Sequence, residues 1–207
     1  MAESLDGLRQ QASHCTDCDL HARATQTVFG DGPPDARVVL VGEQPGDHED
    51  RDGHPFVGPA GRLLTRALED AGLDRGAVYV TNAVKHFKWR PAGKVRLHQK
   101  PNAAEVRACS QWWQRELRVI QPDLTVLLGA TAAQAVAGSK VRVTRDRGQV
   151  LTTDHGEVLV TMHPSAVLRL QHEERAQAYD ALVADLRVAA DYVNALTRPD
   201  RSSPGGS

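Results

Sequence analysis

Three cysteines are the residues of this chain best suited to bind a metal. Cys15 and Cys18 form a Cys-x-x-Cys pair, and Cys109 is the remaining thiol of the sequence. Two thiols at this spacing bind one metal centre readily, but three thiols leave one ligand position open. A thioredoxin-type redox motif is disfavoured, because the pair follows a polar segment and not a strand. The spacing favours a metal centre in which, if Cys109 joins, another residue supplies the fourth ligand.

Four further motifs carry side chains that can bind a small ligand. GEQPG presents Glu43 and Gln44 between two glycines, and PFVGPAG places Phe56 in a loop where it serves as a stacking platform or as core. TNAVKH contains Asn82, whose amide donor and carbonyl acceptor can match the edge of a base. MHPS presents His163 in a turn fixed by proline. Taken singly, each motif is also explained by an ordinary turn or by an asparagine that caps its own loop.

The segment between Asp74 and Glu105 is strongly basic. It holds seven lysines and arginines and no acidic residue, in a chain whose formal net charge is −1. Phe87 and Trp89 are interleaved with these charges, which is more typical of a loop that faces nucleic acid than of a solvated helix face. The segment therefore predicts phosphate contact. His98 ends its KVRLH portion, although a histidine in a loop is usually just exposed.

The overall composition is that of a soluble globular protein. The chain has 207 residues, 41% hydrophobic and 25% charged, which is enough for one sizeable core and short for two domains. No apolar run approaches the roughly 20 residues that span a bilayer. The N-terminal segment is polar and lacks the pattern of a secretory signal. We therefore expect a cytoplasmic protein with no membrane partner.

Apolar runs that end in glycine predict the strands that position these motifs. The two strong candidates are Arg37–Gly42 and Leu124–Gly129, and the two weaker ones are Val78–Asn82 and Val158–Met162. Helical spacing alternates with them over Gly58–Gly72 and around residues 102–120, 131–137 and 173–196. This order predicts an α/β fold, a three-layer α/β/α sandwich with a central parallel sheet of about four strands.

In such a fold, ligands bind at the carboxyl ends of the strands, where the polar motifs fall. We expect a single domain over residues 1–197. The segment 198–207 is rich in Pro, Gly and Ser and is expected to be disordered.

Taken together and in this order, GEQPG, PFVGPAGRLL, TNAVKH, KVRLH and MHPS resemble the motifs of the uracil-DNA glycosylase superfamily. The resemblance runs from Cys15 to about Leu186. Within the superfamily it points to the UdgX branch, which carries an iron–sulfur cluster and becomes covalently attached to DNA. The resemblance implies a monomeric enzyme that excises uracil from DNA, preferably single-stranded, and a uracil pocket at the strand ends.

The resemblance also implies a role for each pocket residue. Phe56 would stack on a flipped uracil, and Asn82 would bond its pyrimidine edge and reject cytosine. His163 would donate toward the uracil oxygen where negative charge grows. Ser165, with the segment that ends at Arg169, would hold the phosphate backbone and fill the vacated stack.

The basic KVRLH loop matches the loop that distinguishes the UdgX branch. His98 corresponds to the covalent nucleophile. Loss of uracil leaves an oxocarbenium-like sugar, which a neutral imidazole can capture before water does. Glu43 is expected to orient His98 or accept its proton, and Gln44 matches the first motif of the branch and is expected among the substrate-binding residues. The expected DNA-binding residues are Lys94, Arg96 and Arg169.

For the metal centre, the resemblance implies a [4Fe–4S] cluster. In related iron–sulfur glycosylases the stretch that matches TNAVKH ends in a cysteine ligand, and His86 occupies that place here. The implied ligands are Cys15, Cys18, His86 and Cys109, and the cluster would be structural. Zinc in a Cys₃His site has compatible ligand chemistry and is the alternative.

Two other functions agree with parts of this pattern. The first is a conventional turnover uracil-DNA glycosylase, in which His98 is a bystander and water completes hydrolysis. The second is a non-catalytic nucleic-acid-binding protein whose fold is held together by a metal. Product formation on uracil-containing DNA separates the catalytic functions from the binding one, and a covalent adduct separates the first two.

Overall fold

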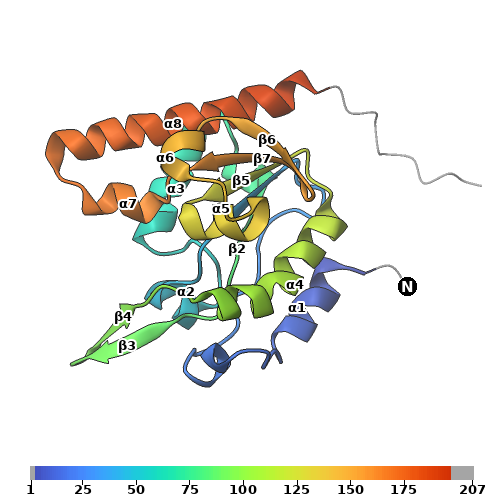
Figure 1. Ribbon diagram of the computed structural model, residues 1–207, viewed down its shortest axis with the longest axis vertical. Helices are drawn as coiled ribbons and strands as arrows, with labels where there is room; N and C mark the ends of the chain where they lie inside the picture. Colours follow the sequence, from blue (N-terminus) through green and yellow to red (C-terminus); the bar gives the residue numbers. More distant parts are fainter. Residues whose placement is uncertain (1–2, 197–207) are drawn as a thin grey trace, which may run out of the picture.

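The structure, a computed structural model, describes residues 3–196, so the segment 198–207 lies outside the described residues. Its centre is a five-stranded sheet in the order β2-β1-β5-β7-β6 (Figure 1). The strands are β1 (Val38–Gly42), β2 (Val78–Asn82), β5 (Leu124–Leu128), β6 (Val150–Thr153) and β7 (Gly156–Thr161). The first two, β5 and β7 are parallel, which confirms the predicted sheet. The strand β6, which no pattern in the sequence predicts, pairs antiparallel with β7 at one edge.

Helices cover both faces of this sheet. The helices are α1 (Leu5–Ala12), α2 (Asp47–Asp52), α3 (Pro59–Asp70), α4 (Ala103–Ile120), α5 (Ala130–Ala137), α6 (Val143–Asp146), α7 (Pro164–Arg169) and α8 (His172–Ala195), with 3₁₀ turns η1 (Asp19–Ala22) and η2 (Arg75–Ala77). One face packs against α1, α4 and α5, and the other against α3, α7 and α8 (Figure 1). This confirms the three-layer arrangement. Within residues 3–196, no helix combines the length and apolarity needed to cross a bilayer.

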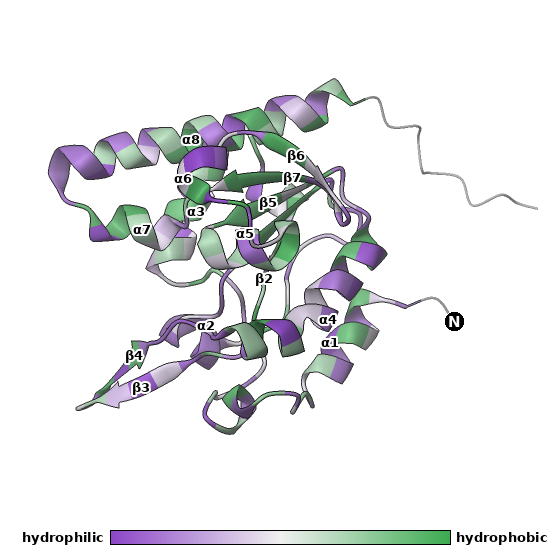
Figure 2. Ribbon diagram, viewed as in Figure 1, coloured by the Kyte–Doolittle hydropathy of each residue, from purple (hydrophilic) through white to green (hydrophobic). Residues whose placement is uncertain are grey.

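The alternation of side chains along β1 shows how one strand serves two cores. Val39 and Val41 belong to the core under α1, α4 and α5, whereas Val38 and Leu40 belong to the core under α3 and α8. All five residues of β1 are buried, and the inner strands are largely hydrophobic (Figure 2). Each such buried side chain contributes about 1.5–3 kcal/mol to folding. The strand ends are therefore held rigidly.

The sequence predicts a loop for the basic KVRLH segment, and this prediction is wrong. The segment forms one strand of a hairpin and part of its turn. The hairpin consists of β3 (Trp89–Ala92) and β4 (Val95–His98), which pair antiparallel with Trp89 opposite His98. It projects from the body of the molecule (Figure 1). Gly93 has a φ of 61°, so it supplies the left-handed conformation that a two-residue hairpin turn requires. His98 thus lies on a strand, at the base of the hairpin.

Candidate active site

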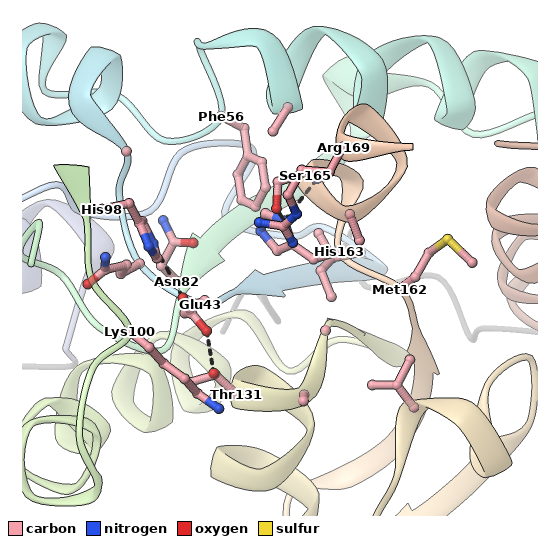
Figure 3. A pocket seen from close by; sticks show the side chains of 18 of the residues that line it. Glu43, Phe56, Asn82, His98, Lys100, Thr131, Met162, His163, Ser165 and Arg169 are labelled. Atoms are coloured by element: carbon pink, nitrogen blue, oxygen red, sulfur yellow. Dashed lines mark hydrogen bonds and ion pairs between the residues drawn. The ribbon is translucent and has the colours of Figure 1, made fainter. Parts of the chain in front are cut away.

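A cavity of about 640 Å³ opens at the carboxyl edge of the sheet, where parallel strands of an α/β fold place their ligands. Its walls come from the ends of β1, β2, β5 and β7, from the segment before α3, from α7 and from the base of the β3–β4 hairpin. The predicted site residues that line it are Glu43, Gln44, Phe56, Asn82, His98, His163, Ser165 and Arg169 (Figure 3). The cavity thus brings together residues from five separate motifs.

The position of Asn82 depends on a glycine in the neighbouring strand. Asn82 is the last residue of β2, is buried, and pairs in register with Gly42 of β1. A Cβ atom on Gly42 would overlap Oδ1 of Asn82 and lie 2.7 Å from Cζ of Phe56. Phe56 itself has a left-handed φ of 57°, a strained conformation for a bulky residue that is typical of functional sites. The amide and the aromatic ring therefore meet at one wall only because Gly42 has no side chain.

His163 faces Phe56 and has a defined tautomer. Their ring centroids lie 6.3 Å apart with an interplanar angle of 27°. The Nδ1 atom of His163 accepts the backbone N–H of Ser165 at 3.1 Å, so its proton must be on Nε2. Burial, with smaller effects from Arg169 and His98, lowers the pKa of His163 to about 4. At neutral pH the ring is uncharged and its Nε2–H is the hydrogen-bond donor left for a ligand.

His98 and Glu43 form a close pair at the opposite wall. Nε2 of His98 lies 3.3 Å from Oε1 of Glu43, and the hydroxyl of Thr131 donates to Oε2 of the same carboxylate (Figure 3). Burial lowers the pKa of His98, and Arg169 lowers it further, although Glu43 opposes both. A neutral imidazole beside a carboxylate is the arrangement of a nucleophile with its proton acceptor.

Gln44 holds the hairpin that carries His98. Its side-chain amide donates to the backbone carbonyls of Gln99 at 3.0 Å and Lys88 at 3.3 Å, and its carbonyl accepts the backbone N–H of Lys88 at 3.1 Å. Lys88 and Gln99 immediately flank the two strands of the hairpin. Gln44 therefore clamps the hairpin base. Its expected contact with substrate stays a prediction, although its side chain does line the cavity.

Arg96 and Lys94, two of the three expected DNA-binding residues, do not line this cavity. The guanidinium of Arg96 pairs with Asp47 at 2.5 Å and with Asp50 at 2.6 Å, so two carboxylates already compensate its charge. It thereby ties β4 to α2. Lys94 lies in the exposed turn of the hairpin. Contact of either residue with phosphate stays a prediction.

A comparison of the sequence with models of protein families finds one family that matches the part of the chain in which these motifs lie. The model of the uracil DNA glycosylase superfamily matches residues 29–187. The chain belongs to the uracil DNA glycosylase superfamily. The match includes every residue that lines the cavity, whereas Cys15 and Cys18 precede it.

Individual members of the superfamily are similar to this chain over much of its length. The Type-4 uracil-DNA glycosylase of Thermotoga maritima is 41% identical over 147 residues, which cover 70% of this chain and 73% of the relative. That of Archaeoglobus fulgidus is 42% identical over 134 residues, which cover 65% and 64%. A Type-5 uracil-DNA glycosylase of Thermus thermophilus is 34% identical over 124 residues, which cover 53% of each chain.

Two residues of the glycosylase site that sequence reasoning missed are Thr131 and Lys100, which also line the cavity. Thr131 lies in the first turn of α5, directly after the predicted strand that ends at Gly129. A hydroxyl at that place is the available signal, since each of the other three predicted strands is followed by a polar motif. Lys100 belongs to the basic segment but follows the hairpin, where no pattern separates it from its neighbours.

Of the expected metal ligands, Cys109 belongs to the core under α1, α4 and α5, and Cys15 and Cys18 pack against that core. The backbone N–H of Lys85 donates to Sγ of Cys109 at 3.2 Å, and the Trp112 indole donates to Sγ of Cys15 at 3.3 Å. Burial raises the pKa of Cys109 to about 12, and it also raises the pKa of Cys18. Each of these two shifts includes a contribution from a neighbouring thiol, so the three sulfurs are close enough to disfavour one another's charge.

His86 adds an imidazole to this group. Its Nε2 atom lies 2.9 Å from the hydroxyl of Thr27, and its Nδ1 atom is buried with no hydrogen-bond partner in the described part of the chain. Such an unpaired nitrogen costs free energy unless a ligand satisfies it. Among residues 3–196, no three His, Cys, Asp or Glu side chains are arranged to hold a single metal ion. A metal centre here thus rests on the donor set and on this unpaired nitrogen.

A buried ion pair fixes the segment that carries both Asn82 and His86. Lys85 and Glu116 are fully buried, with Nζ and Oε2 2.6 Å apart. The carboxylate also accepts the hydroxyls of Tyr79 and Thr81. Breaking a buried pair of this kind typically costs about 3–5 kcal/mol. The network therefore joins the end of β2 firmly to α4, which carries Cys109.

Proposed function

We propose that this protein excises uracil from DNA and then captures the resulting abasic sugar covalently through His98, as in the UdgX branch that its motifs resemble. The observation that carries the proposal is the position of His98 beside Glu43, in the same cavity as Phe56, Asn82 and His163. The relatives named uracil-DNA glycosylases support the first half of the proposal. The His98–Glu43 pair supports the second half.

Excision begins with a uracil turned out of the base stack and into the cavity. Phe56 stacks on the base, and the Asn82 carboxamide bonds its edge with one donor and one acceptor. As the bond between the base and C1′ breaks, the electron pair leaves with uracil and negative charge grows on its carbonyl oxygens. The neutral His163 donates its Nε2–H to that charge, an interaction that is typically worth a factor of about 10²–10³ in rate.

Capture follows at the sugar. The oxocarbenium-like C1′ accepts a lone pair from a ring nitrogen of neutral His98, and a C–N bond forms. The product is an imidazolium, whose remaining ring proton passes to the Glu43 carboxylate 3.3 Å away. The neutral substituted imidazole is a poor leaving group. The adduct is therefore expected to survive denaturation.

For the metal centre, we propose a [4Fe–4S] cluster held by Cys15, Cys18, Cys109 and His86. The N–H groups that point at the sulfurs of Cys15 and Cys109 suit thiolates, because such bonds stabilise negative charge on sulfur. The unpaired Nδ1 of His86 suits the fourth ligand. The cluster would supply cohesion and no chemistry of excision, since it joins the N-terminal segment and α4 to the end of β2.

We further propose that single-stranded DNA is the preferred substrate and that the protein acts as a monomer. An unpaired uracil enters the cavity without the few kcal/mol that unpairing and unstacking cost in a duplex. Single-turnover excision from a strand, alone and annealed to its complement, measures this preference.

A denaturing gel of the protein mixed with a uracil-containing single strand tests the capture step. Wild type should give a shifted band that survives SDS and heat. His98→Ser removes the nucleophile and leaves space for water, so it should release uracil and an abasic strand with no shifted band. His48→Ser changes an exposed histidine on α2 and should behave as wild type.

Two results would change the proposal. A wild-type protein that yields free abasic DNA and no shifted band is a conventional turnover glycosylase, which the names of the Type-4 relatives also allow. A shifted band that persists in His98→Ser assigns the nucleophile to another side chain, and His163 is the first to replace. Absence of uracil release from wild type would leave only nucleic-acid binding.

A further inference from the structure

A second cavity, of about 540 Å³, lies between α3, α7 and α8. Its basic residues are Arg62 and Arg66 on α3 and His172 and Arg175 on α8, all of them exposed. Its apolar residues include Leu63, Val167 and Leu168. None of the described residues that line it is acidic. The cavity, called the basic groove below, is therefore an apolar trough with a cationic rim.

The basic groove and the candidate active-site cavity of about 640 Å³, called the uracil cavity below, lie on opposite sides of one wall. Pro59 lines the groove, while its neighbour Ala60 lines the uracil cavity. On α7, Val167 and Leu168 line the groove, while Arg169 lines the uracil cavity. Because α7 has six residues and a helix rises 1.5 Å per residue, the wall is about 9 Å long. A chain that leaves the uracil cavity over α7 therefore reaches the groove within a short distance.

The arginines of the groove keep their charge available. Among the described residues, none of Arg62, Arg66 and Arg175 forms an ion pair with a carboxylate. The guanidinium of Arg66 lies 5.6 Å from the ring centroid of Tyr179. The nearby Asp70 carboxylate accepts a hydrogen bond from the hydroxyl of Tyr179. Arg96 in the hairpin differs, since it is bound by two carboxylates.

We infer that the basic groove binds the phosphodiester backbone of the strand that carries the uracil, within about three nucleotides of the flipped base. The inference rests on the proposed function for the identity of that strand. Phosphates along a single strand lie farther apart than the 3.4 Å axial rise of B-DNA, so the 9 Å wall corresponds to at most about three phosphates. Guanidinium groups bind phosphate oxygens in a bidentate manner, which suits three arginines on one rim.

The test is direct binding of a single strand whose uracil nucleotide carries a 2′-fluoro substituent, which blocks excision and hence covalent capture, measured by fluorescence anisotropy over a range of salt concentrations. The variant Arg62→Gln/Arg175→Gln removes one cation from each side of the groove. Each phosphate contact contributes about 0.7 to the salt slope on single strands, so the slope should fall by about 1.4. The loss of affinity between 50 and 200 mM salt should then be about 7-fold smaller than in wild type. The control Arg107→Gln/Arg118→Gln makes the same change of charge on exposed positions of α4.

Strand length provides the second arm. The difference between wild type and the groove variant should vanish when only one nucleotide flanks the uracil on the side that crosses α7. Two series of strands, shortened from either end, identify that side. Anisotropy needs no excision, so a failure of the proposed function appears as a missing adduct on the gel and leaves this measurement interpretable.

Three outcomes would overturn the inference. If the groove variant and the α4 control have the same salt slope, the inference is rejected. An equal loss of affinity on the shortest strands would place these arginines next to the uracil nucleotide itself. Binding of free dUMP that is lost in the variant, without a change in the salt slope for DNA, would make the groove a site for a free nucleotide.

Discussion

The two halves of the candidate active-site cavity are built in different ways. Asn82 and His163 stand at or just after the ends of β2 and β7, whose ladders and apolar side chains are buried on both faces. His98 stands on a hairpin whose outer residues are exposed, with 60% of Val95 accessible to solvent. Polar contacts from Gln44 and Arg96 attach this hairpin to the body.

Under the proposed function, this difference separates base recognition from covalent capture. A strand end is positioned by many backbone hydrogen bonds and by close packing, so no single substitution outside it moves it far. The hairpin is positioned by a few hydrogen bonds, and a displacement of about 1 Å can reduce a rate about 10²-fold. Substitutions in the anchors should therefore reduce capture while excision continues.

The largest effect is expected at the sheet edge. Asn82→Ala leaves the polar edge of uracil unpaired in a buried site, which typically costs about 1–3 kcal/mol or more, so excision should fall about 10²-fold. The measurement is uracil release in a single turnover. Asn194→Ala, at an exposed position of α8, is the matched control. Excision at the wild-type rate in Asn82→Ala would show that recognition does not depend on this half of the cavity.

The next effect concerns the hairpin anchor. Gln44→Ala removes three hydrogen bonds at the hairpin base, so capture should fall about tenfold or more while uracil release stays within about threefold of wild type. The readout is the ratio of adduct to free abasic strand. Gln10→Ala, on the exposed face of α1, controls for the change of residue type. A parallel fall in both steps would mean that the two halves act as one rigid unit.

The two histidines should also respond differently to pH. Capture requires neutral His98, whose pKa is lowered by burial, so its rate should be flat above about pH 6.5 and decline as the pH falls through that lowered pKa. His163 stays neutral until the pH approaches its pKa of about 4. Between these limits, acidification should raise the share of free abasic strand. Identical pH profiles for release and capture would contradict this order.

The smallest effect on DNA binding is expected within the hairpin itself. Lys94→Gln removes an exposed charge and should lower the salt slope on single strands by about 0.7 if this lysine contacts phosphate. Arg96→Gln should leave the slope unchanged, because Asp47 and Asp50 already compensate that charge. It should instead lower the melting temperature, since Asp50 is fully buried and loses the cation that pairs with it. A reduced slope in Arg96→Gln would mean that the arginine leaves its carboxylates to bind DNA.

The sheet half of the cavity could be predicted from sequence and the hairpin could not. An apolar run ending in Gly42 or Gly129 is a local signal, and topology then brings the strand ends together. The alternation of apolar and polar residues in β4 spans only the four residues VRLH, and β3 contains Pro91, which argues against a strand. The contact that fixes it joins Gln44 to Lys88 across 44 positions, so no short-range pattern reports it.

The same reasoning explains the other differences. The edge strand β6 has a mixed burial pattern, because it pairs on one side alone, and its sequence VLTT carries a weak signal. Glu116 is a buried acid on a helix, and its partner Lys85 comes from a strand end 31 positions away. Burial of that kind follows from tertiary contacts and not from local preference.

The two ends of the hairpin lie so close together that the hairpin can be removed from the fold, or inserted into it, as a unit. The backbone N–H of Gln99 donates to the carbonyl of Lys88 at 2.9 Å, so the chain leaves and re-enters the body at nearly the same point. A hairpin whose two ends are adjacent can be replaced by a short turn without displacing the neighbouring strands of the sheet, because closing a loop of this length costs little entropy. Replacing residues 89–98 with a tight turn is thus a route to a shorter scaffold that keeps its base-recognition wall. The reverse operation would add the hairpin, and with it the proposed nucleophile His98, to a scaffold that lacks both.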